Sequence, residues 1–439
     1  HTHTHTHTHW LTNPCFFRGL SFIWFIDQPN TLQRLNTPVT ITSASIFPAV
    51  GREHHITNGF QESLMTQVVI AGAGFAACTA VKTLRKNGYN GKITLISPRP
   101  ELFYYPSLIW VPSAKRTLQD LVIPLHDFFQ QYDVDYIQSR VNGIEAETKT
   151  VKTENDLITY DALIIASGGR YIRKLPGIEH AKIACSGWEH TRAFADKLAA
   201  MNEGTVAFGF AGNPNEPSAM RGGPVFEFLF GVDTLLRQQG RREKFNLVFF
   251  SPAPEPGKRL GTKAVQRILT EMKKRNIKTY LGKKMKCITA DSVETETESF
   301  KSDLTLFIPG MTGPDWAADS GLSLSEGGFF KANKFCQVEG QQHVFVAGDA
   351  GSFPGPEWKP KQAHMADLQA EAAARNVLEV LSLKQPRHTF KTELICIIDS
   401  LNSGSLVYRA EKRGLMMKMP PLHWIKVWFE KLYQRPFRR

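Results

Sequence analysis

The sequence has no long hydrophobic run and no closely spaced cysteines. None of its 439 residues fall in an uninterrupted apolar stretch of about 18, so we expect no transmembrane helix. The six cysteines lie far apart, without a C-x-x-C pair or the spacing of zinc ligands. This argues against a disulfide framework, and we predict no metal site. Because hydrophobic residues make up 42% of the chain, most of it should fold.

Positive charge is concentrated at the C-terminus. The formal net charge of +12 is compatible with nucleic acid, an anionic membrane surface or an anionic substrate as partner. Residues 407–439 contain nine basic and two acidic side chains, a net charge of +7, whereas residues 1–64 are neutral overall. The nature of this basic tail therefore decides among the three partners.

The first 64 residues differ from the rest. They begin with alternating His and Thr (HTHTHTHTHW) and lack an initiator Met. Alternating histidines could chelate a metal in an extended strand, but a low-complexity leader is the better interpretation. Since Met65 directly precedes the first convincing strand, we expect residues 1–64 to be a disordered leader or a mis-assigned start.

Residues 67–97 have the pattern of a dinucleotide-binding βαβ unit. The β-branched run 67–71 (QVVIA) is followed by GAGFAA at 72–77, a G-x-G-x-x-A turn. A helical stretch and a second apolar strand at 92–97 (KITLIS) complete the unit. This order makes the match far more specific than the short motif alone.

The unit assigns a role to each residue of its turn. Gly72 makes the tight turn, Gly74 lets the backbone approach a pyrophosphate, and Ala77 allows close packing of helix and strand. Ser97 stands where an acidic residue usually binds a ribose, and a serine can still form a hydrogen bond there.

Two later strands point to a flavin. Residues 160–169 (YDALIIASGG) end in Ala-Ser-Gly, and residues 343–350 (HVFVAGDA) end in Gly-Asp before a predicted helix at 359–378. With these motifs the chain resembles the FAD-containing pyridine nucleotide-disulfide oxidoreductase class. The resemblance implies cofactor contacts from Ala166, Ser167, Gly168, Gly348, Asp349, Lys361 and Gln362. It gives Asp349 the ribityl chain, and Lys361 and Gln362 the pyrimidine side of the flavin. A solvated helical lysine is the alternative for Lys361.

The second βαβ unit looks unsuited to a pyridine nucleotide. The strand at 206–210 and a helix from about Val225 are expected, but no G-x-G-x-x-G joins them. Pro214 and Pro217 instead remove two backbone N–H groups from the turn. The following strand, 246–250, is succeeded by Ser251 rather than by an acidic residue.

Within the class, the chain resembles the sulfide:quinone oxidoreductase and flavocytochrome c sulfide dehydrogenase branch. The resemblance rests on residues 95–111, the segments around Cys185 and Cys396, the turn at 213–224 and the aromatic, basic C-terminus. In that branch two cysteines flank the flavin and hold sulfur. Cys396 matches one of them, while the turn that carries the other has no cysteine here. Cys185 lies on a segment that also carries a family cysteine. Inert buried thiols remain the alternative for both.

The C-terminal segment has the spacing of an amphipathic helix. Helical periodicity places Leu422, Ile425, Trp428, Phe429 and Leu432 on one face and Lys426, Glu430, Lys431 and Gln434 on the other. Aromatic rings beside cations are typical of interfacial helices, so residues 422–433 are predicted to contact a membrane surface. A helix packed on its own domain or on a second copy is the alternative. Nucleic acid is not expected.

These patterns predict an α/β fold with two Rossmann-like three-layer domains, the second inserted in the first. We expect a FAD-binding domain at 65–178 and 301–390, a second domain at 179–300, and a flavin-covering, membrane-docking region at 391–439.

The predicted function is FAD-dependent transfer of electrons from sulfide or another small reductant to quinone. The protein should be a peripheral membrane protein of the cytoplasmic face, and it could form a homo-oligomer. Two alternatives stay open: a type II NADH:quinone oxidoreductase, and a flavin-bound, redox-responsive binding module without turnover.

Overall fold

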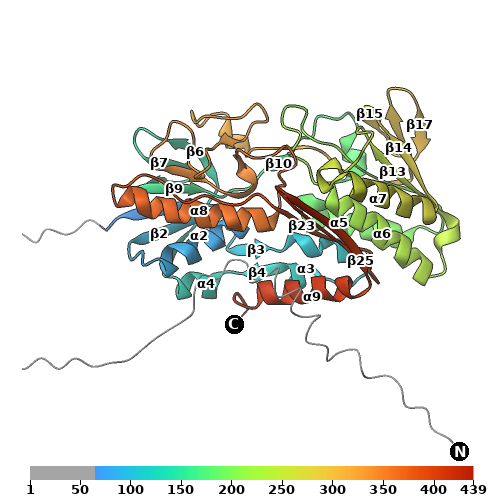
Figure 1. The fold of residues 1–439 in the computed structure, drawn as a ribbon, viewed down its shortest axis with the longest axis horizontal. Coiled ribbons are helices and arrows are strands. Elements are labelled where there is room, and N and C mark those ends of the chain that lie inside the picture. The colour runs from blue at the N-terminus through green and yellow to red at the C-terminus, as the bar shows by residue number, and fades with distance from the viewer. Residues whose placement is uncertain (1–64, 439) are drawn as a thin grey trace, which may run out of the picture. The chain divides into compact units, whose positions relative to one another are not determined.

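Two parallel sheets form the framework of the protein (Figure 1). The structure is a computed structural model that describes residues 65–438, so the predictions for residues 1–64 lie outside the described part. The first sheet has the order β21-β9-β1-β2-β5. Its strands are β1 (Gln67–Ala71), β2 (Lys92–Ser97), β5 (Val134–Gln138), β9 (Ala162–Ile165) and β21 (Val344–Val346). All four pairings are parallel, as a βαβ unit requires.

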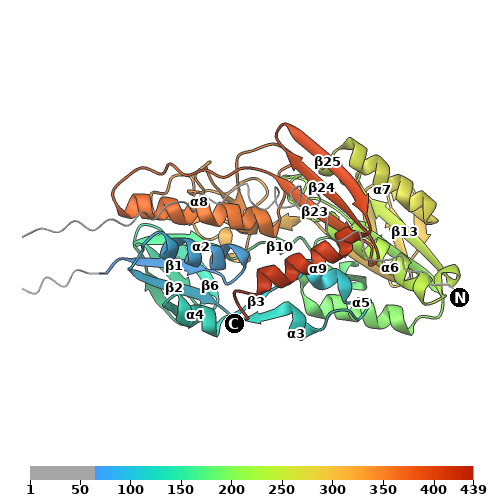
Figure 2. The same cartoon turned by 60° about the horizontal axis from the view of Figure 1, so that its bottom comes forward.

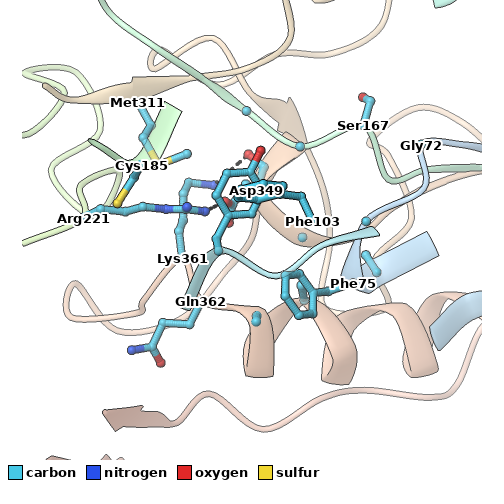
Figure 3. Close-up of a pocket in the computed structure, with 18 of the residues that line it drawn as sticks. Gly72, Phe75, Phe103, Ser167, Cys185, Arg221, Met311, Asp349, Lys361 and Gln362 are labelled. Carbon is cyan, nitrogen blue, oxygen red and sulfur yellow. Dashed lines mark hydrogen bonds and ion pairs between the residues drawn. The ribbon is translucent and has the colours of Figure 1, made fainter. Parts of the chain in front are cut away.

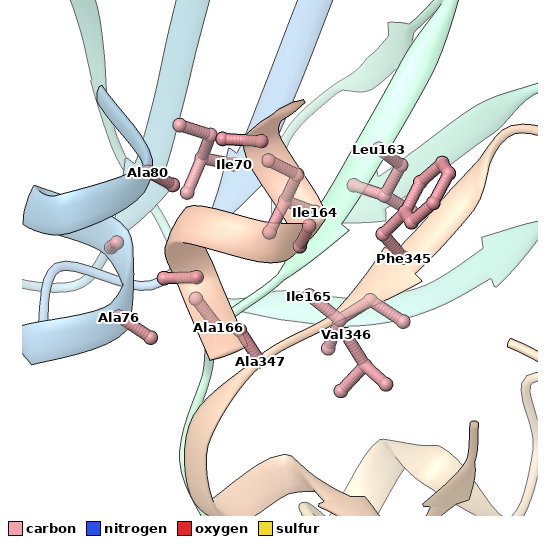
Figure 4. Close-up of a cluster of buried hydrophobic side chains, with 14 of the residues drawn as sticks. Ile70, Ala76, Ala80, Leu163, Ile164, Ile165, Ala166, Phe345, Val346 and Ala347 are labelled. Atoms are coloured by element: carbon pink, nitrogen blue, oxygen red, sulfur yellow. The ribbon is translucent and has the colours of Figure 1, made fainter. Parts of the chain in front are cut away.

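Helices α2 (Phe75–Lys86) and α8 (Ala363–Leu381) pack together against this sheet. Figure 4 shows small side chains of α2, including Ala76 and Ala80, beside the apolar side chains of β1, β9 and β21. Such small residues let helix and sheet approach closely. α8 begins after the predicted position 359, because Pro360 disfavours helical geometry just before it. Lys361 therefore precedes the helix and Gln362 is its N-cap.

The second sheet has the order β11-β18-β12-β13-β14 and is also parallel. Its strands are β11 (Ala181–Lys182), β12 (Gly204–Phe210), β13 (Phe245–Ser251), β14 (Ile277–Leu281) and β18 (Leu304–Ile308), with helices α5 (Trp188–Ala200), α6 (Gly223–Gln238) and α7 (Thr262–Lys274). The predicted fold class is confirmed. We expected the chain to re-enter the FAD-binding domain at residue 301. This boundary lies too early in the sequence, because β18 still belongs to the second sheet.

Short elements connect and flank the two sheets. Three-stranded antiparallel sheets are formed by β6 (Val141–Glu145), β7 (Thr150–Thr153) and β8 (Leu157–Thr159), and by β15 (Met285–Ile288), β16 (Ser292–Thr295) and β17 (Ser299–Lys301). Strand pairs join β3 (Glu101–Phe103) to β4 (Val122–Pro124), β10 (Arg170–Tyr171) to β19 (Met311–Thr312), and β20 (Phe330–Lys331) to β22 (Gly351–Ser352). The short helices are η1 (Tyr105–Trp110), α3 (Leu118–Leu121) and α4 (His126–Gln131).

The C-terminal region is an antiparallel sheet followed by a helix. Strands β23 (Leu394–Asp399), β24 (Gly404–Ala410) and β25 (Arg413–Met419) precede α9 (Pro421–Gln434), which packs on β23 and β24 (Figure 2). Helix α9 turns its polar side inward: His423 pairs with Asp399, Lys426 with Glu227, and Glu430 with Arg116. Trp424 and Trp428 are 70% and 57% exposed. The predicted amphipathic helix thus exists, with charged residues buried and tryptophans outside.

Among residues 65–438, no helix combines the length and the apolarity that crossing a bilayer would require.

The ion pair between Arg116 and Glu430 should contribute much of the stability with which α9 packs on the rest of the protein. The Glu430 carboxylate accepts a hydrogen bond from Arg116 Nε at 2.9 Å, and its side chain is only 6% exposed. Glu430→Ala would leave the partly buried Arg116 without its carboxylate partner. We expect the free energy of unfolding to fall by about 2 kcal/mol. Urea denaturation measures this, with the exposed Lys431→Ala as control. An effect no larger than the control's would show that the pair does not hold α9.

Candidate active site

The carboxyl ends of both parallel sheets border one cavity of about 930 Å³. Residues after β1, β2, β5, β9 and β21 line one part of it, and the β12–α6 turn and β23 line another. Ligand sites of α/β proteins lie at this end of the strands, and the volume suits a large cofactor with room for a small substrate. This cavity is therefore the candidate active site.

Gly72 and Gly74 of the first turn are glycines for different physical reasons. Gly72 has φ +122°, and a Cβ there would lie 2.2 Å from the carbonyl oxygen of Ala166, so the packing of β1 against β9 demands glycine. A Cβ on Gly74 would meet no atom within 4 Å. Gly74 has an ordinary φ of −82° and is the N-cap of α2. The backbone at Gly74 thus leaves a free cradle at a helix N-terminus, as a pyrophosphate requires.

Ser97, the predicted ribose contact, lies next to a second serine, Ser139. Ser97 Oγ donates to the carbonyl oxygen of Arg99 at 2.6 Å, so it is already engaged within its own loop. Ser139 follows β5, and its amide donates to the carbonyl oxygen of Ser97 at 3.1 Å. The Ser139 hydroxyl is buried and has no partner among the described residues. Sequence reasoning missed Ser139, whose only signal is its place directly after a strand of the sheet.

Three buried polar atoms on the cavity wall have no partner within residues 65–438: Ser139 Oγ, Arg221 Nε and Gln362 Oε1. Buried polar groups in folded proteins are nearly always hydrogen-bonded. A bound group with its own donors and acceptors would satisfy all three. Together with the Gly74 cradle, they show that the residues present fit a dinucleotide such as FAD.

Asp349 lies at the centre of the cavity and is ion-paired with Arg221. Figure 3 shows Arg221 extending past Cys185 toward Asp349, with Gly72 and Phe75 on the other side. Lys361 Nζ donates to the carbonyl oxygens of Asp349 (3.3 Å) and Gly351 (2.8 Å). Burial lowers the pKa of Lys361 to about 8, although the Asp349 carboxylate opposes this. Lys361 is thus a half-buried, hydrogen-bonded residue that precedes the helix, and its interpretation as a solvated helical lysine is wrong.

The cavity gathers nearly all of the residues singled out in the sequence. Those that line it are Gly72, Gly74, Ser97, Ala166, Ser167, Gly168, Cys185, Gly348, Asp349, Lys361, Gln362 and Cys396. Ala77 is the exception: it is fully buried behind the turn and acts through packing, which is the role expected of it.

Two thiols face the cavity from different elements. Cys185 follows β11, and Cys396 lies on β23, with its Sγ 3.6 Å from the position a Cβ would take on Gly223. Burial raises the pKa of Cys185 to about 11 and that of Cys396 to about 12. Both thiols are therefore protonated at neutral pH, and nucleophilic chemistry at either needs a base.

A buried acid and base pair lines the cavity beside these thiols. Glu227 of α6 is 5% exposed and is ion-paired with Lys426 of α9. Burial raises the pKa of Glu227 to about 7, although Lys426 opposes this shift. Such a carboxyl exchanges protons readily near neutral pH. Sequence reasoning missed Glu227; its signal was a single acidic residue within the apolar run PVFEFLF.

The turn between β12 and α6 is long and is held to other parts of the chain. Residues 211–222 separate the strand from the helix. Asn213 fastens the turn, donating from Nδ2 to the carbonyl oxygens of Met311 (2.9 Å) and Gly327 (3.0 Å). The turn brings Met220 and Arg221 to the cavity wall. Sequence reasoning missed Arg221, because its place in the cavity depends on contacts of the turn with residues far away in the sequence.

Comparison with known proteins agrees with this geometry. The model of the pyridine nucleotide-disulphide oxidoreductase family matches residues 66–208 and 244–370. The chain is 25% identical over 390 residues to a sulfide-quinone reductase of Aquifex aeolicus, covering 83% of this chain and 90% of that protein. It is 22% identical over 351 residues to a type II NADH:quinone oxidoreductase of Staphylococcus aureus, covering 72% and 83%.

A solved structure shares the whole fold. The sulfide:quinone oxidoreductase structure from Aquifex aeolicus superposes with a TM-score of 0.79 at 23% identity, covering 85% of this chain and 91% of that one. The family match covers more than half of the chain and includes the whole first βαβ unit. The chain is therefore a FAD-dependent oxidoreductase that belongs to the pyridine nucleotide-disulphide oxidoreductase family and is similar to sulfide-quinone reductase.

Proposed function

We propose that this protein oxidises sulfide or another small reduced sulfur compound and delivers the electrons to quinone at a membrane surface. One observation carries the proposal: the cavity that fits FAD also contains Cys185, Cys396 and a carboxyl group that titrates near neutral pH. These are the groups that sulfur chemistry needs.

Each group has a definite task in this proposal. Bound FAD would accept an electron pair from the donor and release it to the acceptor. Cys396 would form an S–S bond with the donor sulfur, and the electron pair released in this step is the pair that bound FAD would accept. Glu227 takes the proton of the Cys396 thiol, since that thiol is protonated at neutral pH. Lys426 keeps the Glu227 carboxylate paired between turnovers.

The β12–α6 turn, in which the resembled sulfide-oxidising branch carries a thiol, here brings Arg221 to the cavity. Its guanidinium lies in the cavity near Cys185 (Figure 3). We propose that Cys185 supplies the second thiol, because no cysteine occurs in residues 211–222.

The exposed face of the C-terminal region suits a bilayer. Trp424, Trp428 and Leu415 are each more than half exposed, although large apolar side chains are normally buried. Lys431 and Arg435 lie on the same outward side of α9. Tryptophan beside lysine and arginine is typical of helices that lie in the headgroup region. We propose that this face docks on the cytoplasmic side of the membrane, where quinone is available.

An assay of sulfide-dependent quinone reduction tests the proposal. The purified protein with FAD, sulfide and a short-chain quinone should reduce the quinone, and NADH in place of sulfide should support little or no turnover. Quinone reduction with NADH alone would favour the type II NADH:quinone oxidoreductase. FAD binding without turnover from sulfide, thiols or NADH would favour a non-catalytic module.

Glu227 should set the pH dependence of the first half-reaction. Its carboxylate must be deprotonated to accept the Cys396 proton, so the rate of flavin reduction by sulfide should rise with pH up to about 7 and then level off. In Glu227→Gln the rate should fall roughly 100-fold and lose this step. Stopped-flow absorbance of the flavin across the neutral range measures both. A retained step would assign it to another group.

A further inference from the structure

A second cavity, of about 440 Å³, lies between α7 and the β25 edge of the C-terminal sheet. We call it the basic groove, because its wall contains Lys263, Arg267, Lys274, Arg275 and Lys418 but only one acidic residue, Glu271. It shares no residue with the wall of the FAD cavity. The groove is therefore a separate feature with a strong positive charge.

Some of these cations are engaged and others are free. Glu271 Oε1 accepts hydrogen bonds from Arg275 (2.8 Å) and Lys418 (2.9 Å), so one carboxylate is shared by two cations. Arg267 donates to the carbonyl oxygen of Met416 at 2.7 Å. Lys263 and Lys274 have neither an ion pair nor a hydrogen bond within residues 65–438. The groove thus has an excess of unneutralised charge.

Three of the cations follow one side of α7. Lys263, Arg267 and Lys274 are four and seven residues apart along the helix, which places them on one stripe. The remaining wall is uncharged, with apolar side chains and a few polar ones: Phe230, Ile268, Ile398, Met416, Gln266, Thr270, Ser400 and Ser405. A ligand that combines an anionic group with an apolar body complements this surface.

The groove meets the proposed membrane face at the end of the C-terminal sheet. Lys418 of the groove pairs in the sheet with Ser405, and Gly404 beside it pairs with Met419. A Cβ on Gly404 would lie 2.8 Å from the Cβ of Leu422 in the first turn of α9. Trp424, the most exposed tryptophan of α9, is in the same turn. The same strand β25 also carries Leu415, which is 52% exposed.

We propose that the basic groove binds the phosphate headgroup of an anionic phospholipid while α9 lies on the bilayer. The proposal rests on the membrane docking described above and adds a specific site to it. Basic pockets next to a membrane-contacting helix recognise anionic headgroups through their phosphate, and the apolar wall accommodates the start of the acyl chains.

Vesicle co-sedimentation of the FAD-loaded protein tests this site. The vesicles contain either phosphatidylcholine alone or phosphatidylcholine with phosphatidylglycerol. The triple variant Lys263→Gln/Arg267→Gln/Lys274→Gln should lose most of the gain in affinity that phosphatidylglycerol confers, a drop on the order of 100-fold at low salt. Its binding to pure phosphatidylcholine should stay unchanged.

Two further variants make the result specific. Lys283→Gln/Lys284→Gln/Lys286→Gln removes the same charge from exposed positions at β15, on the opposite side of the view from α9, and should bind within about twofold of wild type (Figure 1). Equal losses of affinity in both triple variants would contradict the proposed lipid site, since the net charge of the protein alone would then explain binding.

Trp424→Ala/Trp428→Ala should weaken binding to both vesicle types. Unchanged binding of this double variant would contradict the proposed docking face. Binding of inorganic phosphate to the groove at constant ionic strength, together with equal affinity of the wild-type protein for the two vesicle types, would show a soluble phosphate site and contradict the lipid proposal.

Discussion

Cys396→Ala should retain FAD and lose flavin reduction by sulfide, with a rate constant lower by roughly 1000-fold or more. The reason is positional: Cys396 lies on β23 in the wall of the cavity, against the first residue of α6 and beside Glu227. Alanine removes the sulfur while it keeps the strand and its packing. Anaerobic stopped-flow absorbance of the bound flavin measures the effect.

Two other cysteine variants show whether the effect is specific to Cys396. Cys336→Ala is the control, because Cys336 is fully buried and does not line the cavity, so reduction should be unchanged. Cys185→Ala should slow turnover as well, since we assign it the second thiol. Unchanged reduction in Cys396→Ala would remove Cys396 from the mechanism, and inert buried thiols would then be the correct interpretation.

Gly74→Val should abolish stable FAD binding without unfolding the protein. The position has an ordinary φ of −82°, and a Cβ there would meet no protein atom within 4 Å. The side chain would therefore occupy the place of the pyrophosphate at the start of α2. Loss of about two charge-assisted hydrogen bonds, worth roughly 2 kcal/mol each, corresponds to about 1000-fold in affinity. Flavin fluorescence during titration of the apoprotein with FAD measures it.

A matched glycine serves as the control for Gly74→Val. Gly143 in β6 also has open space at its Cβ position but does not line the cavity, so Gly143→Val should bind FAD normally. Gly72→Val should behave differently again, because its side chain would collide with the backbone of Ala166 and prevent folding. FAD binding by Gly74→Val at wild-type affinity would contradict the placement of the cofactor.

Local patterns were enough to predict the cofactor half of the site. The turn at 72–77, the Ala-Ser-Gly strand end and Asp349 each depend on neighbours close in sequence, and the structure brings all of them to one cavity. The fold class followed for the same reason, since both βαβ units have short apolar strands that alternate with helices.

Long-range contacts explain what sequence reasoning missed. The inward side of α9 is polar because Lys426 and Glu430 meet Glu227 and Arg116, partners that are 199 and 314 residues away. Helical periodicity identifies two faces but not which one is buried when ion pairs replace apolar contacts. Arg221 depends likewise on a turn held by Asn213 against residues 311 and 327.

The most direct test of the central claim is an anaerobic titration of the FAD-loaded protein with sulfide and, separately, with NADH, followed by flavin absorbance. The cavity with two thiols and the fastened turn at 211–222 predict that sulfide reduces the flavin with a near-stoichiometric endpoint. NADH should leave it oxidised on the same timescale. Rapid bleaching by NADH with no response to sulfide would contradict the proposed function.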